Sequence, residues 1–444
     1  MKSIIIAMKH TSLFWNRQAE IQFIQSRLRR GGLGYLTGRR RIGKTALLKR
    51  ICSQWNGLYH QAVEGTPDQQ LLHLCEEWSA RIPILGEIRP RSWGEFFKLI
   101  STQKLPKLIV LDEFPYWTAA DPGFASHFQK WVDHHLPSLK CLVLVSGSSQ
   151  SMLDSHFLGR QAALFGRSIF HLRIKPMSYR WFCKALGFSA QDPQSFTRFT
   201  MVGGVPHYWK LIHSASVLEQ ADELYFNSSA MLTDEPSSWL RDEGISGHLS
   251  KAALDLVGRG VRKPSELASR LAVPQGNLSR PLSVLLELGF MRRELPFGES
   301  SRSTKKVLYN IEDPALSFYY GTYLPHRALW ATYPAAKKMQ ILELHASGHW
   351  ENLCRRSFAG SNRYWSGKSE IDLVAPLPDP KEGYLVGECK WAWVDKKVES
   401  RLLEDLKTRF EPTELGQTLK KKYPITYRIF SKKDLSTTAN LEKS

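Results

Sequence analysis

A glycine-rich segment near the N-terminus has the residue types that bind a triphosphate. It reads Gly38-Arg39-Arg40-Arg41-Ile42-Gly43-Lys44-Thr45-Ala46, with the spacing G-x-x-x-x-G-K-[ST]. The glycines let the loop curl so that its N–H groups face the phosphates, while Lys44 reaches the β- and γ-phosphates and Thr45 ligates Mg²⁺. A glycine-rich turn with an incidental lysine is the alternative. The strand-like run before the motif and the helical pattern after it favour a site for ATP and Mg²⁺.

Two acidic residues follow an apolar run further along the chain. Asp112 and Glu113 come directly after residues 108–111, which predict a buried parallel strand. We expect Asp112 to hold Mg²⁺ through water and Glu113 to polarise the attacking water. An acidic pair after a strand is otherwise often a solvated loop. Following a phosphate loop, the pair predicts hydrolysis of the nucleotide rather than binding alone.

Three further polar residues are candidates for the same site. The next apolar strand, 141–145, ends in Ser146-Gly147-Ser148-Ser149. Ser146 is the first candidate and Ser148 the second for contact with the γ-phosphate or the water, and helix capping is the alternative role. Arg167 precedes another strand-like alternation. It is a candidate arginine finger for its own or a neighbouring subunit's nucleotide, with an ordinary surface arginine as the alternative.

From about residue 12 to residue 320 the chain resembles the prokaryotic AAA+/STAND-type proteins described as archaeal-type ATPases. The resemblance adds to the motifs above an entry box, F-x-x-R-x-x-E, and two later motifs. These are Phe14-Trp15-Asn16-Arg17-Gln18-Ala19-Glu20, Pro176-Met177-Ser178-Tyr179 and Val202-Gly203-Gly204-Val205-Pro206-His207-Tyr208. The resemblance implies a five-stranded parallel sheet with the strand order of the additional-strand ATPase class, followed by a helical lid.

The middle of the chain has the pattern of a winged helix-turn-helix. Helices are expected over 248–257, 264–271 and 275–288, and a two-stranded wing over 290–293 and 305–310. Such an element can contact DNA or protein. The residues suited to base edges and phosphates are Gln275, Asn277, Ser279 and Arg280 on the third helix, and Arg292, Arg293, Lys305 and Lys306 on the wing.

The last hundred residues bring acids and a lysine together. A basic helix over 335–345 and a second helix from Gly348, which carries Glu351, precede strands within 364–375 and 383–391 joined by a proline-rich loop. These strands would place Asp372, Glu388 and Lys390 at one edge, where two carboxylates can bind Mg²⁺ or Mn²⁺ and activate water for phosphodiester hydrolysis. The spacing resembles the PD-(D/E)xK nuclease superfamily. That resemblance implies a helical acid at Glu351, metal-binding acids at Asp372 and Glu388, and a catalytic Lys390.

The elements that carry these residues predict an α/β chain with four segments. They are a P-loop ATPase core with a parallel sheet over 12–175, a helical lid and connection over 176–245, a winged helix-turn-helix over 246–325, and an α/β restriction-endonuclease-like domain over 335–444. The 444 residues are 42% hydrophobic and 23% charged, which excludes global disorder. The six cysteines form no C-x-x-C pair, and no apolar stretch reaches membrane-spanning length, so a cytoplasmic protein is expected.

The net charge of +19 favours an anionic partner, with nucleic acid ahead of a membrane surface or an acidic protein. The first hypothesis is therefore a DNA-associated ATPase coupled to a metal-dependent nuclease. The second is a nucleotide-dependent signalling or scaffold ATPase whose winged helix and inactive nuclease-like domain bind protein. Both are compatible with a homo-oligomer.

Overall fold

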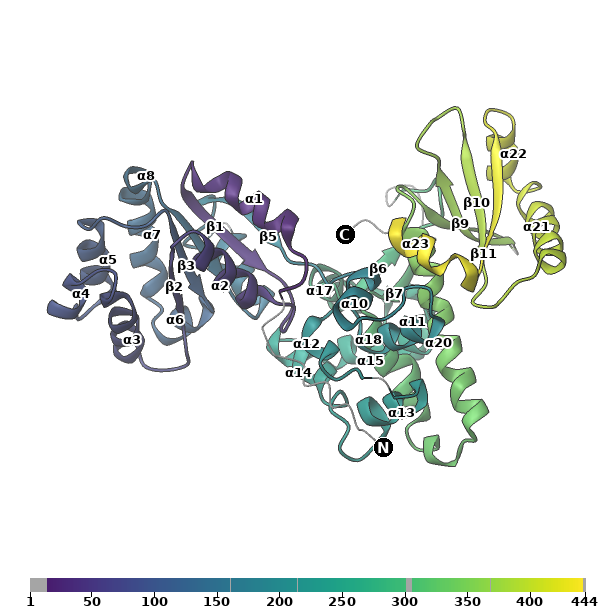
Figure 1. Ribbon diagram of the computed structural model, residues 1–444, viewed down its shortest axis with the longest axis horizontal. Helices are drawn as coiled ribbons and strands as arrows, with labels where there is room; N and C mark the ends of the chain where they lie inside the picture. The colour runs from purple at the N-terminus through teal and green to yellow at the C-terminus, as the bar shows by residue number, and fades with distance from the viewer. Residues whose placement is uncertain (1–13, 160, 214, 301–305, 368, 442–444) are drawn as a thin grey trace, which may run out of the picture. The chain divides into compact units, whose positions relative to one another are not determined.

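The computed structural model describes residues 14–159, 161–213, 215–300, 306–367 and 369–441 (Figure 1). The chain forms two compact units, the first ending at Lys175 and the second beginning at Pro176. Each unit has its own sheets and its own buried side chains, so the two are described separately.

The first unit is built on a parallel sheet of five strands. The strands are β1 (Gly32–Thr37), β2 (Leu58–Gln61), β3 (Leu108–Asp112), β4 (Leu142–Ser146) and β5 (Ser168–Arg173). Their order is β2-β3-β4-β1-β5, so β4 lies between the strand that leads into the phosphate loop and the strand that ends in Asp112. This is the strand order expected from the resemblance.

Helices cover both faces of this sheet. Alternate residues of the strands point to opposite faces, so Leu111 and Val143 belong to one apolar core while Val110 and Leu144 belong to the other. The helices are α1 (Gln18–Leu28), α2 (Lys44–Gln54), α3 (Pro67–Ser79), α4 (Ile84–Glu87), α5 (Trp93–Ser101), α6 (Pro115–Ala120), α7 (Phe124–His134), α8 (Leu136–Leu139) and α9 (Gln150–Phe157).

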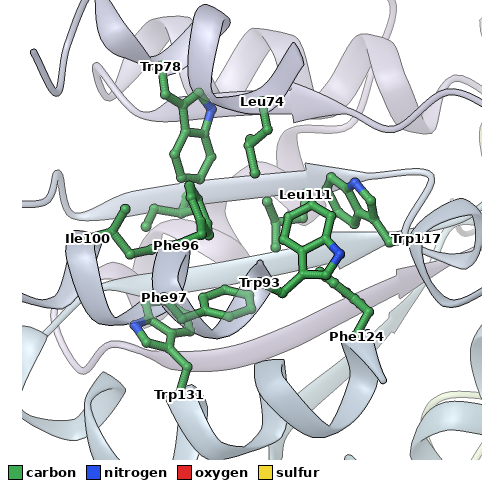
Figure 2. Close-up of a pocket in the computed structure, with 11 residues that line it drawn as sticks. Leu74, Trp78, Trp93, Phe96, Phe97, Ile100, Leu111, Trp117, Phe124 and Trp131 are labelled. Atoms are coloured by element: carbon green, nitrogen blue, oxygen red, sulfur yellow. The ribbon is translucent and has the colours of Figure 1, made fainter. Parts of the chain in front are cut away.

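One of the two cores is dense in aromatic rings (Figure 2). Trp93 packs edge-on against Phe124 with ring centroids 4.7 Å apart, and Phe97 stacks on Trp131 at 5.4 Å. The cavity that these rings enclose is lined only by aromatic and aliphatic residues from α3, α5, α6, α7 and β3. The cavity therefore belongs to the apolar core that packs against β3, and its lining offers no polar side chain that would select a ligand.

The second unit begins with a helical part. Its helices are α10 (Tyr179–Leu186), α11 (Pro193–Val202), α12 (Pro206–Trp209), α13 (Val217–Ala221), η1 (Asp222–Phe226), α14 (Glu235–Asp242), α15 (His248–Gly258), α16 (Pro264–Arg270), η2 (Gln275–Leu278) and α17 (Ser279–Glu287). A two-stranded antiparallel sheet of β6 (Met291–Glu294) and β7 (Leu308–Ile311) follows. Then come α18 (Pro314–Phe318), η3 (Tyr319–Tyr323), α19 (Leu324–His326) and η4 (Trp330–Thr332).

The rest of the second unit is a mixed sheet with helices. The order along the chain is α20 (Ala335–Arg356), β8 (Asn362–Ser366), β9 (Ser369–Pro376), β10 (Tyr384–Cys389), α21 (Lys396–Phe410), α22 (Glu414–Lys420), β11 (Ile425–Phe430), η5 (Lys432–Asp434) and α23 (Leu435–Leu441). The sheet order is β11-β10-β9-β8. β10 is antiparallel to β9 and parallel to β11.

Two expectations about this part were wrong. The separate helices over 335–345 and from Gly348 are one helix, α20, because the buried Ala346 and Trp350 anchor it on either side of Gly348. A glycine inside a helix costs only about 1 kcal/mol, which such packing offsets. The stretch 364–375 also forms two strands rather than one, since the positive φ of Gly367 (58°) reverses the chain between β8 and β9.

Candidate functional site

The phosphate loop runs from the end of β1 to the start of α2. Gly38, Arg41 and Gly43 have φ values of 152°, 66° and 97°, the left-handed region that lets the loop curl. A Cβ on Gly38 would lie 2.8 Å from the carbonyl oxygen of Ile174. Lys44 is buried, and its Nζ donates to the carbonyl oxygens of Gly38 (2.5 Å) and Arg39 (3.2 Å). The ammonium group thus lies inside the loop, in the place that fits a β/γ-phosphate ligand.

Asp112 joins the phosphate loop to the neighbouring strands. The Thr45 hydroxyl donates to Asp112 Oδ2 at 2.8 Å. Tyr59, on the edge strand β2, donates its hydroxyl to the same oxygen at 3.0 Å. A hydroxyl and a carboxylate oxygen are hard ligands of the kind that Mg²⁺ prefers, so this donor set fits the expected cation. Tyr59 was not identified from the sequence, because no motif links a strand-edge tyrosine to an acid 53 residues away.

Glu113 lies just beyond β3 and is held in a fixed position. Its φ is 57°, and the backbone N–H of Ser148 donates to its Oε2 at 2.8 Å. Burial raises the pKa of Glu113, and the neighbouring Asp112 adds to this, against the opposing effects of Ser148 and Lys44. A carboxylate with a raised pKa is a better proton acceptor than an exposed one.

The two candidate serines have different surroundings. Ser146 is fully buried at the end of β4, and its hydroxyl has no hydrogen-bond partner among the residues that the structure describes. Ser148 meets Glu113 through its main chain. Of the two serines, therefore, the second candidate is the one joined to the predicted water-activating acid.

Arg17, from the entry box of the resemblance, contacts the phosphate loop through its side chain. It is 3% exposed, pairs with Glu20 at 2.9 Å, and donates to the carbonyl oxygen of Ile42 at 3.1 Å. Burial lowers the pKa of Arg17, although the carboxylate of Glu20 opposes the shift. The F-x-x-R-x-x-E spacing was the available signal, but it did not reveal that the arginine contacts the loop.

Arg167 does not lie at this nucleotide site. It precedes β5, whose first residue Ser168 pairs with Leu33, whereas the phosphate loop follows the other end of β1. The five residues from Ser168 to Arg173 advance about 17 Å along β5, so Arg167 and the phosphate loop lie at opposite edges of the sheet. Arg167 also forms an ion pair with Asp133, with Nε 2.7 Å from Oδ1. Action on its own nucleotide is therefore excluded, and action on a neighbouring subunit stays a prediction. Arg173, which pairs with Thr37 at the end of β1, lies at the edge of the sheet that carries the phosphate loop.

A second group of charged residues lies at β9 and β10. The register pairs Leu373 with Gly387, so Asp372 and Glu388 are neighbours across the two strands. The backbone N–H of Cys389 donates to Asp372 Oδ2 at 2.8 Å. Lys390 Nζ lies 2.6 Å from Glu388 Oε1, and Arg409 from α21 binds the other oxygen at 2.9 Å. The expected residues are thus brought together, and Arg409 is an addition that the sequence did not indicate.

Electrostatics tie Glu351 to the same group. Burial, together with the charges of Glu351 and Glu388, raises the pKa of Asp372 to about 7 against the opposing effects of Cys389 and Arg363. Burial alone would lower the pKa of Lys390, but its hydrogen bond and charge interaction with Glu388 raise it. Within the described residues, no three or more His, Cys, Asp or Glu side chains are arranged to hold a metal ion by themselves. Mg²⁺ needs only one or two carboxylates when substrate phosphate and water complete its ligands.

Of the residues predicted to bind nucleic acid, most are exposed and one is held by contacts within the chain. Gln275, Asn277, Ser279 and Arg280, from η2 and the start of α17, are exposed, as are Arg293 and Lys306. Lys305 lies outside the described residues. Arg292 is held within the chain: its guanidinium pairs with Glu312 (3.1 Å) and donates to Asn352 of α20, and its contact with nucleic acid stays a prediction. This arginine joins β6 to α20, and its side chain is 28% exposed.

Comparison with known proteins identifies two matching regions. Residues 14–208 match the family model of an ATPase domain predominantly from Archaea. Residues 337–402 match a family of archaeal and bacterial proteins of unknown function. In the described part of the chain, no helix combines the length and apolar character needed to cross a bilayer.

Relatives extend over most of the chain. An uncharacterized protein of Methanocaldococcus jannaschii is 25% identical over 419 residues, which cover 89% of this chain and 91% of that protein. Among solved structures, the Walker-type ATPase paby2304 of Pyrococcus abyssi has a TM-score of 0.51 at 15% identity, covering 69% of this chain and 96% of that one. The ORC2 protein of Aeropyrum pernix has a TM-score of 0.39 at 14% identity, with 74% and 93% covered. The first unit, with its sheet order and phosphate loop, is a P-loop ATPase domain.

Proposed function

We propose that this protein is an ATP-hydrolysing enzyme associated with DNA, in which the P-loop ATPase domain is joined to a metal-dependent nuclease. In the first unit Lys44 binds the phosphates, Thr45 and Asp112 hold Mg²⁺, and Glu113 accepts the proton of the attacking water. Mg²⁺, when bound, neutralises charge on the phosphates. Ser148 supports this role because its N–H orients the Glu113 carboxylate.

The observation that carries the nuclease proposal is the placement of Asp372, Glu388 and Lys390. Helix α20 is followed by three antiparallel strands, then by helix α21, and β11 adds to β10 in parallel. A mixed sheet with a helix before it and helices after it supports the proposed α/β restriction-endonuclease-like domain. Glu388 and Lys390 are two residues apart, so they share a face, and Asp372 lies on the adjacent strand. A divalent cation between the two carboxylates would supply Lewis-acid activation of the scissile phosphate.

The association with DNA rests on the exposed polar residues before β6. The helices α15, α16 and α17 with the β6–β7 sheet have the order of a winged helix-turn-helix, and the residues at the start of its third helix are exposed. Gln275 and Asn277 suit adenine edges, while Arg280 suits guanine or phosphate. The positive net charge of the chain adds a salt-dependent attraction for the DNA backbone.

A nuclease assay with matched variants tests this proposal. Single- and double-stranded DNA and RNA are incubated with the full chain and Mg²⁺ or Mn²⁺, with and without ATP. Asp372→Ala and Lys390→Ala should abolish cleavage while ATP hydrolysis is unchanged. Asp379→Ala and Lys381→Ala, at exposed positions of the loop between β9 and β10, serve as controls. Absence of cleavage by the wild-type protein under every condition would contradict the nuclease assignment.

A scaffold function is the second candidate, and the ion pairing of the site favours it. Glu388 is engaged by both Lys390 and Arg409, so neither of its oxygens lacks a cationic partner. Glu351 lies 3.8 Å from Arg355 and from Arg363. In this interpretation the acids are neutralised within the chain, and the C-terminal domain binds protein. A wild-type protein that hydrolyses ATP but neither cleaves nor retards nucleic acid at low salt would support this alternative.

A further inference from the structure

A buried carboxylate connects β6 to the candidate nuclease site. Glu294 is 3% exposed. The Asn310 side chain donates to its Oε2 at 2.8 Å, and Arg292 and Arg355 approach its Oε1 at 3.8 and 3.7 Å. Burial alone would raise the pKa of Glu294, but the charges of Arg292, Arg355 and Arg363 outweigh burial and lower it. Glu294 is therefore a buried anion that depends on these arginines.

Two of these arginines also contact the residues of the candidate site. Arg355 donates to the main-chain oxygen of Asp372 at 2.8 Å and lies 3.8 Å from Glu351. Arg363 lies 3.8 Å from the same Glu351 oxygen. Arg355 thus contacts both Glu294 and Glu351, whereas Arg363 contacts Glu351 and affects Glu294 through its charge. These contacts connect β6, a strand of the proposed wing, to Glu351 and Asp372, two of the three predicted acids.

The energetics of buried ion pairs indicate that this group is not there for stability alone. Removing two charges from water costs several kcal/mol, and apolar residues of similar volume are often at least as stabilising. A buried charge network does, however, fix the geometry of its members. Arg355, 10% exposed in its side chain, cannot rotate away from Asp372 without weakening the charge pairing of Glu294.

We propose that Glu294 is a positioning residue for the nuclease site: it holds Arg355 so that Glu351 and the Asp372 strand keep the geometry needed to bind a divalent cation. This inference rests on the proposed nuclease function. It also assigns a role to β6, because Arg293, the neighbour of Glu294, is exposed where DNA would meet the wing. If bound DNA displaced β6, Glu294 would move with the strand and would shift Arg355, which contacts Asp372.

The test compares Glu294→Gln with Glu312→Gln in the full chain. Glutamine keeps the shape of Glu294 and can still accept the hydrogen bond from Asn310, but it removes the charge. Glu312 is a matched control because it pairs with Arg292 (3.1 Å) and Arg356 in the same region, whereas the contacts to Glu351 come from Arg355 and Arg363. Mn²⁺ binding to nucleotide-free protein is measured together with kcat and KM for DNA cleavage. Asp372→Asn identifies the Mn²⁺ signal that belongs to this site.

We expect Glu294→Gln to weaken Mn²⁺ binding and lower kcat by about 10- to 100-fold, with KM for DNA little changed. Glu312→Gln should change each value less than about 2-fold. Wild-type Mn²⁺ affinity and kcat in Glu294→Gln would overturn the inference while leaving the nuclease function intact. If Glu294→Gln fails to fold, Arg355→Lys replaces it, since lysine keeps the charge but not the branched contacts; wild-type values there overturn the inference too. A wild-type chain that neither binds Mn²⁺ nor cleaves refutes both proposals.

Discussion

The backbone N–H of Ser148 donates a 2.8 Å hydrogen bond to the carboxylate of Glu113, joining the end of β4 to the end of β3 at the nucleotide site. Glu113 has a positive φ of 57°, so its main chain is held in a conformation that a glutamate seldom adopts. Strain of this kind is found where a side chain must be aimed closely enough to react.

Replacing Glu113 by glutamine should separate ATP binding from hydrolysis. The glutamine side chain can still accept a hydrogen bond from Ser148, but it cannot take a proton, so we expect kcat for ATP hydrolysis to fall by about 10²- to 10⁴-fold with ATP affinity retained. Lys44→Ala should instead remove ATP binding. Steady-state hydrolysis and a nucleotide-binding titration measure the two effects, with Glu64→Gln, at an exposed position, as the control. Hydrolysis by Glu113→Gln at the wild-type rate would refute the assignment of the base.

The pH dependence of ATP hydrolysis should reflect the raised pKa of Glu113. Burial of this carboxyl favours its protonated form, which cannot act as a base. As the pH falls, kcat should therefore decline at a higher pH than an exposed glutamate would produce. A profile of kcat against pH at saturating Mg²⁺ and ATP tests this. A profile that stays flat down to the usual glutamate range would argue that another group accepts the proton.

Tyr59→Phe should weaken the use of Mg²⁺ without removing ATP binding. The phenylalanine keeps the packing of the ring but loses the hydroxyl that donates to Asp112 at 3.0 Å. Loss of an outer partner of a metal-binding carboxylate costs about 10- to 100-fold in metal affinity, so the Mg²⁺ concentration for half-maximal hydrolysis should rise. Tyr116→Phe, in the same unit and 40% exposed, is the matched control. Identical Mg²⁺ curves for the two variants would show that Tyr59 has no such role.

Arg280 and Arg292 should affect DNA binding differently. If the start of α17 contacts phosphate, Arg280→Ala should weaken binding and reduce the salt slope of log K by about 1. Arg292→Ala should leave the slope unchanged and lower the stability of the second unit, because this arginine binds Glu312 and Asn352. Fluorescence anisotropy over a salt series, together with thermal melts, distinguishes the two. An equal reduction of the salt slope of log K in both variants would show that Arg292 also contacts phosphate.

Acid should destabilise the second unit through His345. This side chain lies partly buried on α20 against Phe318, its Nε2 lies 3.1 Å from the Thr200 carbonyl oxygen, and removal from water lowers its pKa to about 4. Below the ordinary histidine pKa the unfolded chain takes up a proton that the folded chain does not. Stability is therefore fully present above pH ~6.5 and is lost towards pH ~4, by about 3 kcal/mol. Urea unfolding at both ends of this range should show a smaller change in His345→Gln than in His248→Gln, which alters an exposed histidine.

The sequence predicted those features that depend on local chain chemistry. The glycine and lysine spacing of the phosphate loop, the buried strand before Asp112, and the two-residue spacing of Glu388 and Lys390 all follow from residues close together in the chain. The position of β4 between β1 and β3 came from the resemblance and is confirmed.

The remaining features depend on contacts between distant residues. Tyr59 reaches Asp112 only because β2 pairs with β3. Arg167 and Arg173 look equivalent in the sequence, but the direction of β5 places them at opposite edges of the sheet. Arg292 and Arg293 are neighbours with opposite surroundings, since alternate residues of a strand face opposite sides. No local pattern distinguishes these pairs.

The continuity of α20 has a mechanical consequence. Its 22 residues span about 33 Å as one rod. His345, near the middle of α20, is hydrogen-bonded to the main-chain oxygen of Thr200 on α11. Arg355, near the end of α20, donates to the main-chain oxygen of Asp372. Because α20 is one helix between these two contacts, a displacement of α11 would move the end of α20 that contacts Asp372.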